Sequence, residues 1–330
     1  MSDDIRKKEI EIQILKKVFG EEVTFEQSEQ PDFIVKYGTD IEHGVEITEL
    51  YYDGTSARIK NGAYLNELIT KQKFRHKDDK KKLKVHDIEY YAQTRNFSPV
   101  RMPALFLPKY NMHDYVRTLE NAIMVKNKKL KKYSPRISES CMLIIYDREN
   151  PFINIHEKDI AKQLFLPSLS EAVRKSNYQE IYLVTGVDKQ NRYIPLKSYL
   201  LQSDFLLFME FIKDRGLAKE LEQVYAHPLF AFAEILTRRG NVVHFGSVTN
   251  EDVIGKIVVY CGRYGIGLVS HDNDNWGVGI FDTFPQQTIS DDRIFVLDPN
   301  SDFFDDVLYT AYEETVQTKV ASTGLFFRTK

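Results

Sequence analysis

Cysteine is scarce in this chain, and neither of its two cysteines lies at a spacing typical of a metal site or a disulfide framework. Cys141 and Cys261 are 120 residues apart in apolar stretches, which predicts two buried, reduced thiols and a reducing compartment. No run approaches the ~18 uncharged apolar residues that a membrane-spanning helix needs. Residues 1–8 contain no apolar signal region. These absences favour a cytoplasmic protein that does not span a membrane.

An excess of positive charge is also absent. The chain has 45 Lys and Arg against 48 Asp and Glu, a formal net charge of −3. This excludes general nucleic-acid binding by a cationic chain, but a local basic surface is enough to bind phosphates. The chain has no P-loop, no GxSxG motif, no repeat of fixed period and no low-complexity tract.

Two further patterns have simple interpretations. Glycines at 262–268 lie between a predicted helix and a predicted strand, whereas a dinucleotide-binding loop leads from a strand into a helix. They therefore predict a tight turn and close strand packing. The acidic stretches at 271–275 and 291–292 are predicted to be surface turns.

The first half of the chain has the hydrophobic periodicity of an α/β layer fold with a mixed sheet. Residues 53–110 interrupt this pattern as an insertion, with a helix at 56–74, a flexible basic loop at 75–84 and an irregular connector at 99–108. The elements predicted for the core are helices at 4–19 and 112–133 and strands at 31–37, 44–51, 141–146 and 180–185.

The second half predicts a smaller α/β unit. The expected division is a core domain at 1–195 with its insertion at about 53–110, a helical bridge at 196–226 and an accessory domain at 227–330. Within the last of these we expect helices at 227–238, 251–264 and 302–320 and strands at 241–245, 265–270 and 276–281. The accessory domain is a candidate for substrate recognition, homo-oligomer formation or binding of a partner protein.

Asp32 and Glu46 carry the chemistry that the sequence predicts. Residues 31–37 and 44–51 read as a hairpin, and a turn centred near Asp40 places even-numbered side chains of both strands on one face. Two convergent carboxylates on a rigid sheet can hold Mg²⁺, which prefers oxygen ligands. Such a site supports metal-assisted phosphodiester hydrolysis.

The predicted order of elements resembles the core of the PD-(D/E)XK (restriction-endonuclease-like) nucleases. It consists of a helix, a strand that opens with Pro31-Asp32, a strand with an apolar residue before Glu46, and a further helix and strand. The similarity covers roughly residues 4–184, and its specific motif lies in residues 31–50. The resemblance implies a Mg²⁺- or Mn²⁺-dependent nuclease, with DNA as the expected substrate and Asp32 and Glu46 as metal ligands. It also implies a third ligand on the first helix, for which Glu11 is the candidate. Restriction and phage defence are among the roles of this family.

The sequence departs from the family pattern at Thr48, where the motif has a lysine two residues after the glutamate. Either the site is inactive, or a lysine from another element replaces the missing one. Lys126 is the first candidate because it lies on the apolar stripe of the helix at 112–133, between Ile123 and Leu130. Lys129 and Lys60 are the second and third candidates.

Each of these residues also has an ordinary structural interpretation. Asp32 could cap a turn, Glu46 could lie on the exposed face of a half-buried strand, and Glu11 could face solvent. The aliphatic part of Lys126 could extend past the stripe so that its ammonium reaches water.

Two other functions remain open from the sequence. The first is a catalytically degenerate nuclease fold that binds DNA or acts as an assembly module. The second is a different enzyme within 227–330, which a pocket near His244, His271 and Asp282 would indicate.

Overall fold

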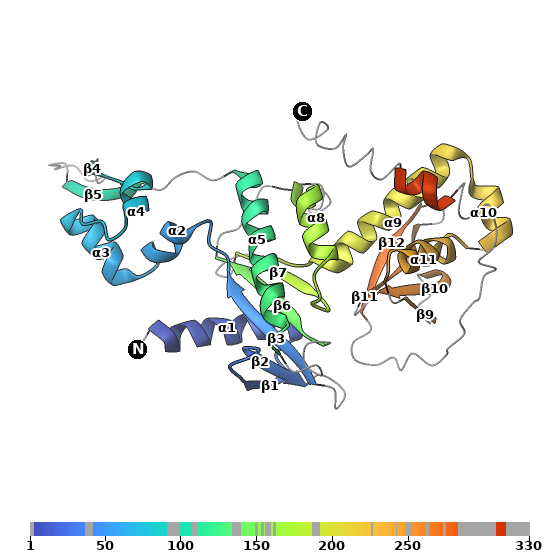
Figure 1. Ribbon diagram of the computed structural model, residues 1–330, viewed down its shortest axis with the longest axis horizontal. Coiled ribbons are helices and arrows are strands. Elements are labelled where there is room, and N and C mark those ends of the chain that lie inside the picture. The colour runs from blue at the N-terminus through green and yellow to red at the C-terminus, as the bar shows by residue number, and fades with distance from the viewer. Residues whose placement is uncertain are drawn as a thin grey trace. The chain divides into compact units, whose positions relative to one another are not determined.

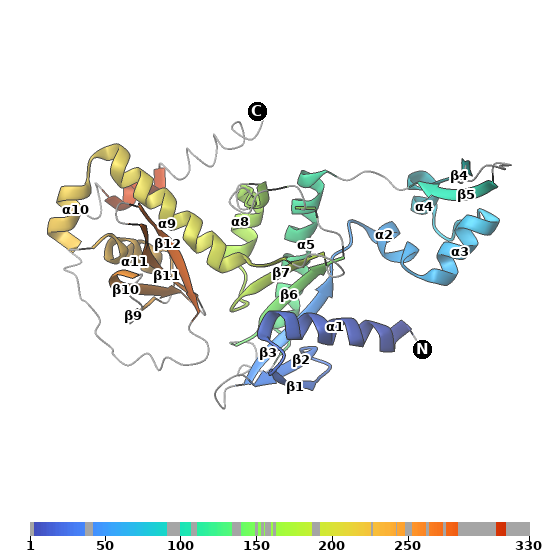
Figure 2. The ribbon, with the colours of Figure 1, turned by 180° about the vertical axis from the view of Figure 1, so that it is seen from behind.

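The computed structural model divides the chain into two compact units, which are described separately (Figures 1 and 2). Unit 1 comprises Met1–Thr48 and Ile123–Lys330, and unit 2 comprises Glu49–Ala122. The residues that the structure describes are 3–36, 42–90, 100–106, 111–133, 140–148, 151–152, 155, 160, 163–186, 192–225, 227–241, 243–247, 253–261, 264–272, 275–282 and 308–314.

A six-stranded sheet forms the first part of unit 1, with strand order β1-β2-β3-β6-β7-β8. Strands β1, β2 and β3 pair antiparallel, β6 and β7 pair parallel, and β7 and β8 pair antiparallel, so the sheet is mixed, as the sequence predicts. Its strands are β1 (Thr24–Gln27), β2 (Phe33–Lys36), β3 (Glu42–Glu49), β6 (Met142–Asp147), β7 (Ile181–Thr185) and β8 (Arg192–Pro195).

Helices cover both faces of this sheet. Helix α1 (Asp3–Phe19) packs its apolar stripe, including Ile14 and Leu15, against inward-facing strand residues such as Phe33 and Val45. Helix α5 (Met112–Leu130) crosses the boundary between the units, and its part from residue 123 lies on the opposite face of the sheet from α1 (Figures 1 and 2). Side chains alternate along each strand, so a residue of β3 faces either α1 or α5.

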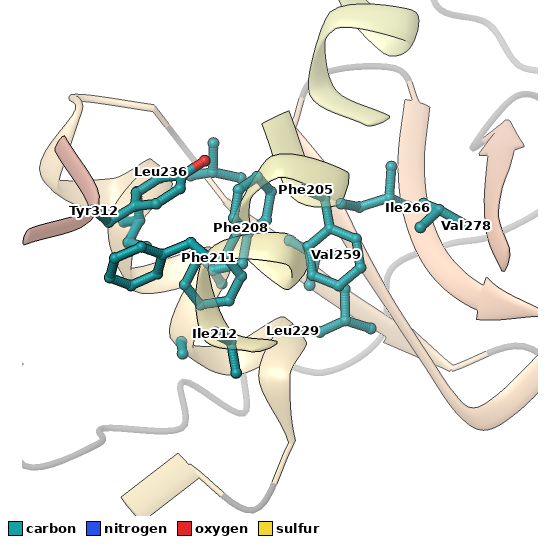
Figure 3. Close-up of a cluster of buried hydrophobic side chains, with 14 of the residues drawn as sticks. Phe205, Phe208, Phe211, Ile212, Leu229, Leu236, Val259, Ile266, Val278 and Tyr312 are labelled. Atoms are coloured by element: carbon teal, nitrogen blue, oxygen red, sulfur yellow. The ribbon is translucent and has the colours of Figure 1, made fainter. Parts of the chain in front are cut away.

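The second part of unit 1 packs helices against a four-stranded antiparallel sheet with order β12-β11-β10-β9. Phenylalanines of α9, among them Phe205, Phe208 and Phe211, fill its core (Figure 3). Aromatic rings contribute large buried areas, and Phe205 meets Phe232 edge-on at a centroid distance of 5.0 Å. The elements are α8 (Pro167–Arg174), α9 (Leu196–Arg215), α10 (Ala218–Tyr225), α11 (Pro228–Arg238), β9 (His244–Ser247), β10 (Val253–Cys261), β11 (Tyr264–Asp272) and β12 (Asn275–Asp282).

One predicted helix in this region is wrong. Residues 253–261 form strand β10 rather than part of a helix at 251–264. The run from Ile257 to Tyr260 is rich in β-branched and aromatic residues, which pack well on a pleated sheet. The predicted close packing is confirmed at Gly265, because a Cβ there would collide with the ring of Tyr260. Of the helix predicted at 302–320, residues 308–314 are helical and the remainder lies outside the described residues.

Unit 2 has more regular structure than the sequence predicts. Helices at 54–71 agree with the expected helical stretch, but the predicted basic loop and irregular connector are instead a third helix and a two-stranded antiparallel ribbon. A small core of Tyr64, Leu68 and Leu83 holds these elements together. The elements are α2 (Gly54–Ile59), α3 (Gly62–Lys71), α4 (Lys77–Lys82), β4 (Lys84–Tyr90) and β5 (Val100–Phe106).

No described helix is both long enough and apolar enough to cross a membrane. Cys141 is a buried free thiol, as predicted, whereas Cys261 is a free thiol that is only partly buried.

Candidate functional site

The pairing of β2 with β3 brings Asp32 and Glu46 together. Phe33 lies opposite Val45, and the same register continued by one residue places Asp32 opposite Glu46. Asp32 Oδ2 accepts a hydrogen bond of 2.8 Å from the backbone N–H of Ile47. The carboxyl of Asp32 is thereby fixed to the strand that carries Glu46, and it does not cap its own turn.

Glu46 lies on the face of β3 that is covered by the C-terminal part of α5. It is only 5% exposed, so it is not a surface residue of a half-buried strand. Its Oε1 accepts a hydrogen bond of 2.5 Å from Lys126 Nζ, and its Oε2 accepts one of 2.5 Å from the Tyr133 hydroxyl. Both carboxylate oxygens are therefore engaged by groups at the C-terminal end of α5 and just beyond it.

Lys126 is the lysine that meets the carboxylates. Its side chain is 14% exposed and its ammonium is paired with Glu46, so the ammonium does not reach past the helix to water. Lys129 is exposed on the same helix. Lys60, in unit 2, pairs with Glu49 at 3.3 Å. Thr48, two residues after Glu46, is part-buried on the same strand.

Glu11 is a buried residue of α1. It is 1% exposed, which contradicts the solvent-facing interpretation. Lys7 and Lys8 of the same helix lie 3.5 and 3.2 Å from its carboxylate oxygens, yet its Oε2 accepts no hydrogen bond from the described residues. The carboxylate also acts on Asp32 electrostatically.

The negative charge of Asp32 is only partly compensated by its surroundings. Burial raises the pKa of Asp32 above its ordinary value, and the hydrogen bond from Ile47 lowers it in part. The negative charges of Glu46 and Glu11 raise the pKa of Asp32 further, and the charge of Lys126 opposes them. Clustered carboxylates with a raised pKa are typical of sites that act on a cation or a proton.

Tyr133 is the residue that sequence reasoning does not assign to the site. It follows Lys126 by seven residues and lies just beyond the C-terminal end of α5. In the sequence it reads as one more apolar residue of the helical stripe, and only the position of Glu46 reveals its role. Burial and the neighbouring Glu46 both raise the pKa of its hydroxyl, which therefore stays protonated and acts as a hydrogen-bond donor.

The residues present are compatible with a magnesium site. Among the described residues no three His, Cys, Asp or Glu side chains form a group that could hold a metal ion. Mg²⁺ is, however, often bound by one or two carboxylates together with water and substrate phosphates. The repulsion of Asp32 by the neighbouring carboxylates of Glu46 and Glu11 is a feature that a divalent cation would relieve.

A separate pocket of about 400 Å³ lies in unit 1. Its charged groups are largely paired with one another, since Arg174 and Arg239 both contact Asp204, at 2.7 and 3.5 Å. His244 does not line it, and the side chains of His271 and Asp282 lie outside the described residues. The lining residues are Val173, Arg174, Gln179, Lys197, Leu200, Leu201, Asp204, Leu236, Arg239, Asn241 and Cys261.

Comparisons of the chain with protein-family models, with curated proteins and with solved structures found no match.

Proposed function

We propose that this chain is a metal-dependent nuclease with a PD-(D/E)XK-like core, which hydrolyses phosphodiester bonds in nucleic acid, with DNA as the expected substrate. The observation that carries the proposal is the cluster that Asp32, just before β2, forms with the buried Glu46 of β3 and with Lys126 of α5. With β1 and the inserted elements of unit 2 left aside, the order α1, β2, β3, α5, β6 agrees with the order on which the resemblance rests. A role in restriction or phage defence rests on that resemblance alone.

Asp32 and Glu46 would hold the metal, with Glu11 as the third acidic group. A Mg²⁺ or Mn²⁺ ion held there would lower the pKa of a water and neutralise charge on the scissile phosphate. Lys126 supplies the cation that the motif lacks at Thr48, because its ammonium reaches Glu46 from α5. At that position the ammonium stabilises negative charge that develops on the phosphate. Tyr133 orients Glu46 by donating to its second oxygen.

One observation favours a second candidate function. Lys126 and Tyr133 together satisfy both oxygens of Glu46, as they would if this residue were only structural. The chain would then be a degenerate nuclease fold that binds DNA or assembles with a partner. Its affinity for nucleic acid would fall steeply with salt, but it would show no metal-dependent turnover.

Cleavage assays separate these two functions. Supercoiled plasmid, single-stranded DNA and RNA are incubated with the protein in Mg²⁺, in Mn²⁺ and in EDTA. Glu46→Gln is compared with Glu42→Gln, which makes the same change on the same strand at a residue paired with Lys36 at 3.5 Å. Cleavage that needs metal and is lost only in Glu46→Gln supports the nuclease. Binding without cleavage of any substrate supports the degenerate fold.

A further inference from the structure

Unit 2 differs sharply in charge from the rest of the protein. Residues 49–122 contain 14 Lys and Arg against nine Asp and Glu, a net charge of +5, whereas the whole chain carries −3. Exposed lysines lie along α3 and α4, among them Lys71, Lys77, Lys80 and Lys81. A compact unit of this charge attracts polyanions, because phosphate contacts release condensed counterions.

The ribbon of β4 and β5 has one face without carboxylates. In its register Lys84 lies opposite Phe106 and Ile88 opposite Met102, so alternation places these four side chains and His86 on one face. The two ribbon carboxylates, Asp87 and Glu89, have odd numbers and belong to the other face. Leu105, also on that other face, packs against the small core of unit 2.

The carboxylate-free face is apolar and exposed. Ile88, Met102 and Phe106 are 38%, 47% and 48% exposed, and they are three of the seven large apolar side chains that are exposed in the described part of the chain. The rings of His86 and Phe106 meet edge-on at a centroid distance of 5.5 Å. Exposed apolar side chains gathered on one surface are typical of a binding site.

We propose that this face of the ribbon, formed by Lys84, His86, Ile88, Met102 and Phe106, binds single-stranded nucleic acid. Phe106 provides the ring on which a base stacks, and His86 supports that ring from its edge. Lys84, on the same face, contacts a phosphate, and the exposed lysines of α3 and α4 add to the positive charge of the unit. Stacking on aromatic side chains within a cationic surface is the general way in which proteins hold single strands.

A single strand fits this face better than a duplex does. A duplex keeps its base faces stacked inside, so it would meet the lysines through its phosphates and leave Phe106 and Met102 without a role. The inference that this face of the ribbon holds the substrate of the enzyme rests on the proposed nuclease function. The binding itself is measurable without cleavage.

The test uses the full-length protein in EDTA and a fluorescein-labelled oligothymidylate of about 16 nucleotides, the upper end of the range of known single-strand sites. Fluorescence anisotropy gives Kd at two salt concentrations. For Phe106→Ala we expect Kd to rise about tenfold, since one stacked base is worth ~1–3 kcal/mol. Phe106→Trp, which keeps an aromatic ring, should retain the affinity and so controls for misfolding.

Two matched variants show whether the face itself is responsible. Tyr193→Ala removes an exposed aromatic side chain from β8 in unit 1 and should leave Kd unchanged. Lys84→Gln should weaken binding about threefold and lower the slope of log Kd against log salt by about 0.7, the value for one phosphate contact on a single strand. Arg101→Gln removes a charge from the opposite face, where Arg101 pairs with Glu89 at 2.9 Å, and should have less effect than Lys84→Gln.

The proposal is overturned if Phe106→Ala binds the oligonucleotide as tightly as the wild-type protein does. It is also overturned if duplex competes equally with single strand, or if Phe106→Ala dissociates a dimer in light scattering instead of weakening binding. Failure of cleavage with retained Phe106-dependent binding would remove the nuclease but keep this surface. Cleavage, with binding that the Phe106 substitution does not change, would support the nuclease and overturn the ribbon as its binding surface.

Discussion

Asp79 of unit 2 and the part-buried Asp32 of unit 1 are carboxylates that the protein treats in opposite ways. Asp79 of unit 2 is fully buried and accepts hydrogen bonds from Tyr64 at 2.5 Å, Thr55 at 2.8 Å and Arg58 Nε at 3.1 Å. The Arg58 guanidinium makes a second, closer contact with Asp79. The guanidinium, with the two hydroxyl donors, holds the pKa of Asp79 far below its ordinary value.

Asp32 of unit 1 has far less compensation. Burial, together with the negative charges of Glu46 and Glu11, raises its pKa, and the hydrogen bond from the backbone N–H of Ile47 opposes this only in part. The protein therefore stabilises the charge of Asp79 and tolerates the charge of Asp32. A part-buried charge that folding does not neutralise is expected where a site serves a ligand or a reaction rather than stability.

The largest expected effect concerns Lys126. If unit 1 holds a reactive site, Lys126→Gln should lower the rate of metal-dependent cleavage by about 10²–10³-fold, the usual loss when one charge-stabilising group is removed. Lys129→Gln changes an exposed lysine of the same helix and should stay within about twofold of the wild-type rate. Equal rates for the two variants would contradict a reactive site in unit 1, because Lys126 would then be only a structural partner of Glu46.

The next effect concerns the stability of unit 2. Asp79→Asn should destabilise this unit by about 3 kcal/mol, since it leaves the part-buried Arg58 without its counter-charge. The pKa of Asp79 is lowered in the folded state, so its contribution is complete above the ordinary value of 3.8 and is lost as pH falls below it.

Hydrogen exchange of the α3 amides, measured between pH 6 and pH 3, provides the test. The difference between the wild-type protein and Asp79→Asn should be constant above about pH 5 and shrink in more acidic solution. Asp78→Asn, at the exposed neighbouring residue, is the control. A variant at Asp79 as stable as wild type would mean that the two carboxylates do not differ.

Asp32→Asn should change the free energy of unfolding in the opposite direction to Asp79→Asn, and by less. The amide keeps an acceptor for the Ile47 N–H and removes the repulsion, so we expect a gain of about 1 kcal/mol at pH 7. Because the pKa of Asp32 is raised in the folded state, the cost of its charge is absent below the ordinary pKa of 3.8. It grows as pH rises through the raised pKa.

Denaturant unfolding of unit 1 at several pH values measures this gain. The difference between the variant and the wild-type protein should widen with rising pH. A loss of stability at pH 7 would place Asp32 with Asp79 among the structural carboxylates.

Tyr133→Phe should give the smallest effect. It removes one donor from Glu46 Oε2 and leaves Lys126 in place, at a cost of about 1 kcal/mol or less. Cleavage should fall by about two- to fivefold. Tyr193→Phe removes an exposed hydroxyl of β8 and is the matched control. A loss as large as that in Lys126→Gln would make the hydroxyl an equal part of the site.

The sequence predicts some features of unit 1 correctly because they depend on local rules. Alternation along two strands is enough to place Asp32 and Glu46 on one face, since their relative position depends only on hairpin parity. Helical periodicity is enough to direct Lys126 toward the sheet. The α/β class and the mixed sheet follow from the same periodicities.

Other features depend on tertiary contacts that no short pattern contains. Tyr133 reads as a core aromatic residue until Glu46 is placed beside it. The ribbon of unit 2 contains Pro103 and scattered charges, which hide the alternation of its strands. Strand β10 has glycine and lysine near its start, and its pairing with β11 decides between helix and strand.

The most direct test of the metal site is a titration of Mn²⁺ followed by electron paramagnetic resonance of the free ion. The wild-type protein is compared with Asp32→Asn, and Glu42→Gln is the control. If Asp32 and Glu46 hold a divalent cation, the wild-type protein and Glu42→Gln should bind Mn²⁺ alike, and Asp32→Asn should bind it at least about tenfold more weakly, since it loses a charged ligand. Identical isotherms for all three proteins would contradict a metal-dependent active site at Asp32 and Glu46.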